Sequence, residues 1–151
     1  MKKINNTRGF TIIEVLIVLA IAGLIMLVVF LAVPALQRNA RNTAIKTDAS
    51  AVAGGIAEFQ SNNEGALVTA VNGVGTVKIS SGLATTTATT AKVQGSTSVT
   101  TVTTVPVALN AGLVEVLIGQ KCDTSPSTRA TSIYYALENS STIPQVKCLE
   151  S

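Results

Sequence analysis

The segment that determines the architecture of this chain is RGFTIIEVLIVLAIAGLIMLVVFLAVPALQR, residues 8–38. After Glu14 it contains no charged residue until Arg38. As an α-helix, the apolar part from Val15 to Leu36 is about 33 Å long, which is enough to span the hydrocarbon core of a bilayer. We therefore expect the chain to be inserted in a membrane at some stage.

Glu14 is the unusual residue of this segment, because an acidic side chain in a membrane helix is costly and rare unless it has a partner or a function. One interpretation is structural. Glu14 lies only about 6 Å along a helix from Phe10, so its carboxylate can reach toward the membrane interface. The other interpretation is that the acid is kept for a function.

The residues around Glu14 favour the functional interpretation of this acid over the structural one. The pattern Gly9-Phe10-Thr11-x-x-Glu14, followed by an unbroken apolar run, closely resembles the N-terminal signature of the type IV pilin family, whose precursors carry a class III signal peptide. The resemblance implies that a prepilin peptidase cleaves between Gly9 and Phe10 and then methylates the new N-terminal amine. Residues 1–9 would then be a leader peptide.

The same resemblance implies that Glu14 neutralises the N-terminal amine of a neighbouring subunit during filament assembly. In an apolar helix bundle an ammonium and a carboxylate each need an opposite charge. Their pairing would therefore fix the axial register between subunits more than it adds stability.

The leader also sets the expected orientation, since Lys and Arg beside a membrane segment stay on the cytoplasmic side. Lys2, Lys3 and Arg8 all precede the apolar run, so we expect the C-terminal region to lie outside. A Sec-type signal peptide is the alternative, and it would remove residues up to about Ala35. The run is too long for a signal core and lacks a clear small-x-small cleavage site.

Composition is typical of an exported structural protein. The 151 residues allow one modest domain beyond the helix, and histidine and tryptophan are absent. We find no Gly-rich phosphate loop, no metal-ligand cluster and no Ser or Cys nucleophile with a base, so we predict no catalytic residue, no cofactor and no metal. The net charge of +3 comes from the leader, because residues 10–151 carry 8 of the 11 basic side chains against 8 acidic ones. No face for nucleic acid is indicated.

Residues 38–62 are expected to continue the helix with an amphipathic pattern that ends at Asn62-Asn63-Glu64-Gly65. Apolar residues recur at spacings of four, three, four and three. We prefer docking of this apolar stripe on the chain's own sheet to an intermolecular coiled coil. The stripe consists of Ile45, Ala49, Val52, Ile56 and Phe59, and Arg41, Lys46, Asp48 and Glu58 are assigned to other faces.

Gly23 and Pro34 interrupt the regular helical pattern. Glycine is common in membrane helices and permits close packing, whereas proline kinks a helix. In assembled pilins the stretch between a glycine and a proline is often unwound. Gly23 matches the position of that glycine, but Pro34 lies three residues beyond the usual proline. We predict a kink or an unwound stretch between them in the filament.

Residues 63–151 are predicted to form a β-rich head. Asn72-Gly73 is a hairpin signal between two apolar stretches, and Ser80-Ser81-Gly82 closes the hairpin. The Thr-rich region 85–104 has ten threonines in twenty residues, which suits either an exposed edge strand or a variable, partly ordered surface region with glycosylated hydroxyls. Asn139-Ser140-Ser141 matches a short N-glycosylation pattern.

The end of the chain is predicted to form a hairpin stabilised by a disulfide. Cys122 and Cys148 are the only cysteines, and both lie in the exported part, where thiols oxidise. Closing the loop 122–148 would stabilise the fold by roughly 3 to 4 kcal/mol, and a buried pair of free thiols is the alternative. Pilins similarly often close a C-terminal loop with one disulfide. The hairpin pattern places Ile133, Tyr135 and Leu137 on one face of a strand and continues with Val146 and Cys148 after Pro144.

Together these features predict an α+β fold in which residues 10–37 span the membrane and later pack in a filament core. Residues 38–62 would pack against an antiparallel sheet in the head. The resemblance implies a structural subunit, and we favour the major pilin of a type IV pilus. Minor pilin, pseudopilin of a type II secretion or competence system, and a single-pass surface protein that never polymerises are the alternatives. The acidic calcium-binding cluster of some pseudopilins is not evident among Asp123, Glu138 and Glu150.

The implied partners are other copies of this chain in a helical homopolymer, the membrane, prepilin peptidase, and the pilus assembly platform with its motor. The precursor would lie in the cytoplasmic membrane and the mature subunit in an extracellular filament. Such a filament would serve twitching motility, adhesion or DNA uptake.

Overall fold

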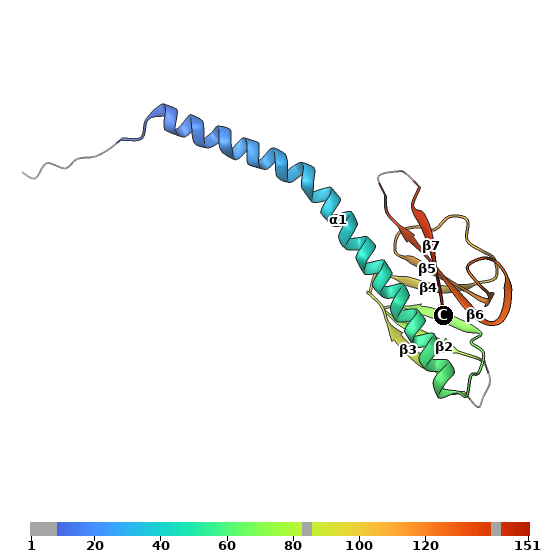
Figure 1. Ribbon diagram of the computed structural model, residues 1–151. Coiled ribbons are helices and arrows are strands. Elements are labelled where there is room, and N and C mark those ends of the chain that lie inside the picture. Colours follow the sequence, from blue (N-terminus) through green and yellow to red (C-terminus); the bar gives the residue numbers. More distant parts are fainter. Residues whose placement is uncertain (1–8, 83–85, 140–142) are drawn as a thin grey trace, which may run out of the picture. The chain divides into compact units, whose positions relative to one another are not determined.

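The computed structural model describes residues 9–82, 86–139 and 143–151 (Figure 1). The leader residues 1–8, Thr85 of the Thr-rich region, and Ser140 and Ser141 of the glycosylation pattern lie outside the described residues. The chain divides into two units, Met1–Gln37 and Arg38–Ser151, which are described separately below.

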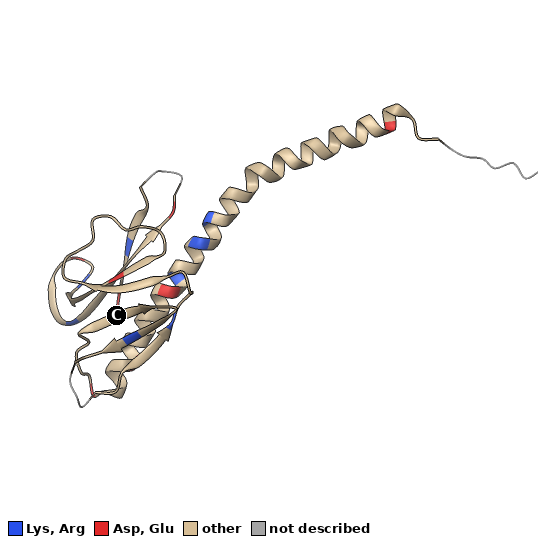
Figure 2. Cartoon of the chain, turned by 180° about the vertical axis from the view of Figure 1, so that it is seen from behind, with Lys and Arg blue, Asp and Glu red and all other residues tan. Residues whose placement is uncertain are grey.

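One helix, α1 (Ile12–Asn62), contains both the apolar segment and its amphipathic continuation. In the first unit the large apolar side chains are exposed, with Leu16 at 59% and Phe30 at 75%. By length and composition α1 could cross a membrane. Figure 2 shows the apolar part of α1 in tan between one acidic residue at its start and the basic residues that follow it. Within the first unit, the described part of α1 leaves these apolar side chains uncovered.

In the second unit α1 buries the predicted apolar stripe against the sheet. Ile45 is 5% exposed, and the other four members of the stripe are fully buried. Burying an Ile, Val or Phe side chain stabilises a fold by roughly 1.5 to 3 kcal/mol. Docking of the stripe on the chain's own sheet is therefore confirmed.

The prediction that Asp48 lies on a helix face other than that of the apolar stripe is wrong. It is buried at 4% exposure. With about 3.6 residues per turn, Asp48 lies roughly 60° from Ile45 around the helix, at the border of the stripe. Its carboxylate accepts hydrogen bonds from the backbone N–H of Gln94 at 3.1 Å and from the hydroxyl of Thr97 at 2.5 Å. These two donors are what allow the acid to be buried.

The helix ends at Asn62, within the predicted stop signal. Gly65 has φ +79°, a conformation that glycine adopts without strain. Its N–H donates to the carbonyl of Gln60 at 2.7 Å, and the N–H of Asn63 donates to the carbonyl of Phe59 at 3.1 Å. These bonds satisfy carbonyls that the end of a helix otherwise leaves open.

The head contains one 7-stranded sheet with the order β3-β2-β1-β4-β5-β6-β7. The strand pairs are antiparallel except β4 with β5, which are parallel. The α+β fold is thus confirmed, with an antiparallel-rich rather than a purely antiparallel sheet. The strands are β1 (Ala70–Val74), β2 (Thr76–Ser80), β3 (Thr89–Lys92), β4 (Ser98–Val102), β5 (Leu113–Gln120), β6 (Pro126–Leu137) and β7 (Gln145–Glu150).

The β1–β2 hairpin turns at Gly75 and not at Asn72-Gly73, so the predicted turn position is wrong. Val74 pairs with Thr76, and Gly75 between them has φ +69°. Asn72 lies inside β1, where its side-chain Oδ1 accepts a hydrogen bond from the N–H of Thr101 at 2.9 Å. A Cβ on Gly73 would collide with the carbonyl of Thr76, so this glycine serves close approach across the hairpin.

The Thr-rich region contributes two strands. β3 is an edge of the sheet, as the edge-strand alternative predicts, whereas β4 lies between β1 and β5. The side chain of Thr101 bridges to β1, because its hydroxyl donates to the carbonyl of Val71 at 3.1 Å and accepts from the N–H of Val71 at 2.8 Å.

Each face of the sheet carries a hydrophobic cluster. The larger cluster lies under α1 and includes Ile133, with Tyr135 and Leu137 packed against it. The smaller one joins Leu109, Leu117, Tyr134 and Ala136, with Val146 and Cys148 packed against it. The antiparallel β6–β7 pair confirms the predicted terminal hairpin and its alternating faces.

Candidate processing and assembly site

Thr11 and Glu14 define the start of α1. Thr11 precedes the first helical residue, and its carbonyl accepts hydrogen bonds from the N–H groups of Glu14 at 3.1 Å and Val15 at 3.4 Å. Glu14 Oε2 in turn accepts from the backbone N–H of Thr11 at 3.3 Å and from its hydroxyl at 3.1 Å. A glutamate that reaches back to the residue before a helix is half of a capping box. The acid thus has a local structural use as well as the predicted assembly role.

The predicted cleavage bond lies outside the helix. Gly9 and Phe10 precede Thr11, are not helical, and are exposed, with Phe10 at 83%. Apart from the chain neighbours of Gly9, no described atom lies within 4 Å of the position that a Cβ on Gly9 would occupy. Both residues at the predicted cleavage bond are thus exposed and outside the helix, and Glu14 lies four residues beyond Phe10.

The carboxylate of Glu14 has no cationic partner among the residues that the structure describes. Its two donors from Thr11 are neutral groups. The positive end of the helix dipole also favours a negative charge in the first turn. Pairing of Glu14 with an ammonium group from another chain stays a prediction.

Gly23 and Pro34 both lie inside α1, which is helical from Ile12 to Asn62. No side chain lies within 4 Å of a Cβ built on Gly23, so this position is open in the single chain. Pro34 has no N–H and leaves the carbonyl four residues before it without the usual helical donor. The predicted kink or unwound stretch concerns the filament and stays a prediction.

The predicted disulfide between Cys122 and Cys148 is confirmed, with the two Cα atoms 5.8 Å apart and a sequence separation of 26. It connects the β5–β6 turn to β7, and the alternative of free thiols is wrong. The N–H of Cys122 donates to Glu150 Oε1 at 2.9 Å. In the same turn, hydrogen bonds from the side chain and N–H of Ser125 lower the pKa of Asp123 below its ordinary value.

A polar clasp, formed by Arg41, Asn42 and Glu138, joins α1 to the end of β6. Arg41 donates from Nε and Nη2 to the two carboxylate oxygens of Glu138, both at 2.7 Å. Asn42 donates from Nδ2 to the carbonyl of Glu138 at 2.8 Å and accepts from its N–H at 2.7 Å. The hydrogen bonds from Arg41 lower the pKa of Glu138, although burial acts in the opposite direction. Sequence reasoning missed this clasp, because no local pattern relates residues so far apart.

Within residues 9–82, 86–139 and 143–151, no group of three His, Cys, Asp or Glu side chains could hold a metal ion. Glu138 is engaged by Arg41, Asp123 by Ser125 and Glu150 by the N–H of Cys122.

Comparison with known proteins yields one match. The prokaryotic N-terminal methylation motif matches residues 4–30, which include Gly9, Phe10, Glu14 and Gly23. No curated protein and no solved structure matches the chain. The motif is typical of type IV pilins and pseudopilins, which are structural proteins and not enzymes. With a long apolar helix packed through its second half on an antiparallel-rich sheet, this chain is a type IV pilin-like protein that carries the N-terminal methylation motif.

Proposed function

We propose that this chain is a structural subunit of a type IV pilus, and specifically its major pilin. One observation carries the proposal: the methylation motif leads directly into a helix whose large apolar side chains are exposed in the part of the chain that the structure describes. A membrane and then the helices of neighbouring subunits can cover that surface in turn. Adhesion, twitching motility and DNA uptake are the activities that such a filament would support.

Processing prepares the chain for assembly. Prepilin peptidase would cleave the exposed bond between Gly9 and Phe10 and methylate the new amine. This removes Lys2, Lys3 and Arg8 and leaves 8 basic and 8 acidic side chains, so the mature subunit is formally neutral apart from its termini. The new ammonium on Phe10 is then four residues from Glu14 of its own chain.

Assembly would pair that ammonium with Glu14 of a neighbouring subunit. The neutral donors from Thr11 satisfy two acceptor sites of the carboxylate but not its charge. Leaving one charge unpaired in an apolar bundle is costly. The ion pair therefore favours the axial register in which both charges are paired. Exchange of lipid for neighbouring helices provides little driving force by itself, because both environments are apolar. Extraction from the membrane therefore requires the assembly platform and its motor.

Mass spectrometry of the N-terminal peptide from material sheared off the cell surface tests the proposal. The expected result is a methylated N-terminus at Phe10. A start near Ala35 would indicate an ordinary secreted protein. Retention of residues 1–9, or absence from the sheared fraction, would indicate a membrane anchor that does not polymerise. A start near Ala35, retention of residues 1–9 and absence from the sheared fraction would each overturn the proposal.

The pseudopilins are the second candidate, because the matched motif is typical of them as well. Deletion of the chain separates the two candidates. Loss of surface filaments in electron micrographs supports the pilus subunit, whereas intact filaments with a loss of protein secretion support the pseudopilin. Loss of only a small fraction of filaments would point to a minor pilin.

A further inference from the structure

The sheet of the head has two edges, formed by β3 and β7, and both lie in the second unit. Six strand spacings separate them, which is about 29 Å across the sheet. An edge strand presents unpaired N–H and C=O groups, to which a strand of another chain can bond. The backbone and the charges of these two edges therefore show what each of them can bind.

The hydrogen bonds of β7 indicate which of its backbone groups face away from β6. Thr131 and Ser151 bond to each other in both directions, at 2.9 and 3.1 Å. In an antiparallel pair such bonded positions alternate along the strand with positions that face outward. The residues of β7 that face outward are therefore Val146, Cys148 and Glu150.

The same reasoning identifies the outward residues of β3. The N–H of Val93 donates to the carbonyl of Gly75 at 3.0 Å, in the register of the β2–β3 pair. Alternation from this bonded position leaves Thr90 and Lys92 facing away from β2. Among the described residues, no turn or loop supplies a backbone partner for the outward groups of either edge.

A second copy in the same orientation would present its β7 to β3 as an antiparallel partner. Five of the six strand pairs from β3 to β7 are antiparallel, and an odd number of reversals makes the two edge strands antiparallel. The pleat also matches. Ala91 and Leu149 belong to the cluster under α1, so the outward residues beside them place their side chains on the other face in both strands.

Strand length and alternation together leave one register for this pairing. Outward residues must lie opposite outward residues, and only one such alignment gives every residue of β3 a partner within β7. Residues 89, 90, 91 and 92 then lie opposite residues 149, 148, 147 and 146 of the second copy. Thr90 and Lys92 would exchange backbone hydrogen bonds with Cys148 and Val146 of that copy.

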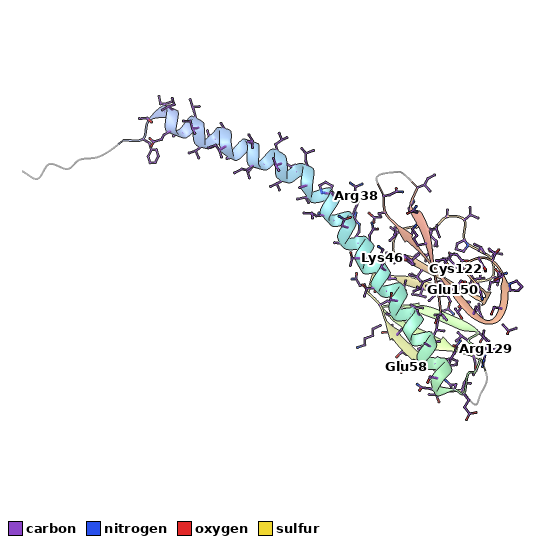
Figure 3. The ribbon with its side chains drawn as sticks, viewed as in Figure 1. Arg38, Lys46, Glu58, Cys122, Arg129 and Glu150 are labelled. Atoms are coloured by element: carbon purple, nitrogen blue, oxygen red, sulfur yellow. A yellow bond between two sulfur atoms is a disulfide. The ribbon has the colours of Figure 1, made fainter. Side chains whose placement is uncertain are left out.

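The charges beside the two edges are complementary in this register. Glu58 of α1 lines the same hollow as Thr89 and Thr90, and Figure 3 shows it on α1 beside this edge, with Glu150 of β7 toward the other. Lys147 pairs with Tyr135 on the α1 side of the sheet and would come opposite Ala91 of the second copy. Glu58 and Lys147 are both exposed, and neither has an ion-pair partner among the described residues.

The same charges oppose the pairing of like edges. Two β3 edges would bring two copies of Glu58 together on one face of the sheet, and two β7 edges would bring together two copies of Lys147. Like charges placed against each other suppress such contacts. Contact between two different surfaces of identical subunits builds open helical filaments when the rotation does not close a ring.

We propose that the β3 edge of one subunit pairs with the β7 edge of a neighbouring subunit, with an ion pair between Glu58 of the first and Lys147 of the second. The partner is thus a second copy of this chain, and the sheets of the two heads become continuous. This inference rests on the proposed function, because it concerns contacts within the filament. It adds an interface between heads to the packing of the apolar helices.

Cross-linking of sheared filaments tests the ion pair on the native chain. A water-soluble carbodiimide joins a lysine amine directly to a carboxylate when the two groups are in contact. We expect mass spectrometry to find a link between Glu58 and Lys147 in filaments. Subunits dissolved in detergent should lack it, because the two residues lie at opposite edges of one sheet. Absence of this link from filaments that carry other carbodiimide links would overturn the proposal.

Charge reversal tests the same contact through assembly. Glu58→Lys and Lys147→Glu should each reduce the yield of sheared filaments several-fold, and the double variant should restore it. Glu58→Lys combined with Lys46→Glu is the matched control. It restores the net charge, but Lys46 lies about 18 Å from Glu58 along α1, so the yield should stay low. Equal restoration by both double variants would indicate a general charge effect and overturn the proposal.

Hydrogen exchange at single amides tests the strand pairing itself. The amides of Thr90 and Lys92 should exchange several-fold more slowly in filaments than in detergent. The amide of Ala91 already faces β2, so its exchange should change little. Unchanged exchange at Thr90 and Lys92 would overturn the continuous sheet, even where Glu58 and Lys147 are cross-linked.

Failure of this inference can be distinguished from failure of the proposed function. If the wild-type chain forms no filaments, the proposed function is wrong and the edge pairing fails with it. If filaments form but show neither the cross-link nor the slower exchange, only the edge pairing is wrong.

Discussion

Glu14 accepts hydrogen bonds from both the hydroxyl and the backbone N–H of Thr11 in its own chain, at 3.1 and 3.3 Å. The side chain therefore caps the helix before any neighbour is present. Both donors are neutral groups, and the carboxylate has no cationic partner among the described residues. Helix capping and the proposed subunit pairing would be two uses of one side chain, at different stages of assembly.

Substitution of Glu14 can separate these two uses. Glu14→Gln keeps an oxygen that can accept from Thr11 but removes the charge, whereas Glu14→Ala removes both. We expect filament yield to fall strongly in both variants, with membrane insertion and cleavage after Gly9 intact. Yield is measured on sheared filaments, and cleavage by mass spectrometry of the N-terminal peptide. Normal yield in Glu14→Gln would mean that the cap and not the charge supports assembly.

The disulfide should account for a large part of the stability of the head. Its loop of 26 residues corresponds to roughly 3 to 4 kcal/mol in the chain-entropy model. The double variant Cys122→Ala, Cys148→Ala is therefore expected to lose about this much unfolding free energy, measured by urea titration of the full chain in detergent and followed by tyrosine fluorescence. A reducing agent should destabilise the wild-type chain and leave the double variant unaffected. A double variant as stable as the wild type would contradict the prediction.

We expect the contributions of Asp48 and Thr97 to the free energy of unfolding to be coupled. The pair is buried, with Asp48 at 4% and Thr97 at 3% exposure. Asp48→Ala leaves the hydroxyl of Thr97 and the N–H of Gln94 without their acceptor, and such a loss typically costs about 1 to 3 kcal/mol. Asp48→Asn retains one oxygen and should cost less.

A double-mutant cycle with Thr97→Val isolates the contact between Asp48 and Thr97. We expect the cost of the double variant to be smaller than the sum of the two single costs, since both substitutions remove the same hydrogen bond. Unfolding free energies from the same urea titrations supply the four corners of the cycle. Strict additivity would mean that the 2.5 Å contact does not couple the two residues energetically.

Glu138 should make the head more stable at pH values above the range in which carboxyl groups ordinarily titrate than at pH values below it. Hydrogen bonds from Arg41 hold the pKa of Glu138 below the ordinary value of 4.5. Because the pKa in the folded state is below that in the unfolded state, this contribution is present above pH 4.5 and is lost as the pH falls through the folded value. In Glu138→Gln that part of the acid dependence should disappear.

The measurement for Glu138 is the unfolding midpoint in urea from pH 7 to pH 3. The difference between wild type and Glu138→Gln should shrink as the pH falls. Asp123→Asn is the control, because the pKa of Asp123 is also lowered but by Ser125 in a separate turn. If the difference for Glu138→Gln stays constant with pH, the ion pair with Arg41 has no effect on stability.

Tyr134 has a hydroxyl that can be removed at little cost. The residue is 5% exposed, and its hydroxyl finds no hydrogen-bond partner among the described residues. A buried polar group without a partner costs about 1 to 3 kcal/mol. We therefore expect Tyr134→Phe to preserve or raise the unfolding free energy in urea. A loss above about 1 kcal/mol would show that the hydroxyl is hydrogen-bonded in the folded protein.

Local patterns in the sequence were sufficient for the long helix, its stop after Asn62 and the apolar stripe from Ile45 to Phe59. Each follows from residue spacing, helix periodicity and the conformational preference of glycine, which act over a few neighbouring residues. The N-terminal methylation motif is equally local, because it matches one continuous stretch, residues 4–30. The two cysteines predicted their disulfide because they are the only cysteines in the sequence.

The chain's distant contacts could not be read from these patterns. The burial of Asp48 depends on donors from residues 94 and 97, and the pairing of Arg41 with Glu138 joins residues 97 positions apart. The Asn72-Gly73 signal was overridden because Asn72 is used to bond β4, which moves the turn to Gly75. The parallel pairing of β4 with β5 requires a connection across the sheet that no turn signal marks. In each case the decisive partner is far away in sequence, and only folding brings its donor or acceptor within hydrogen-bonding distance.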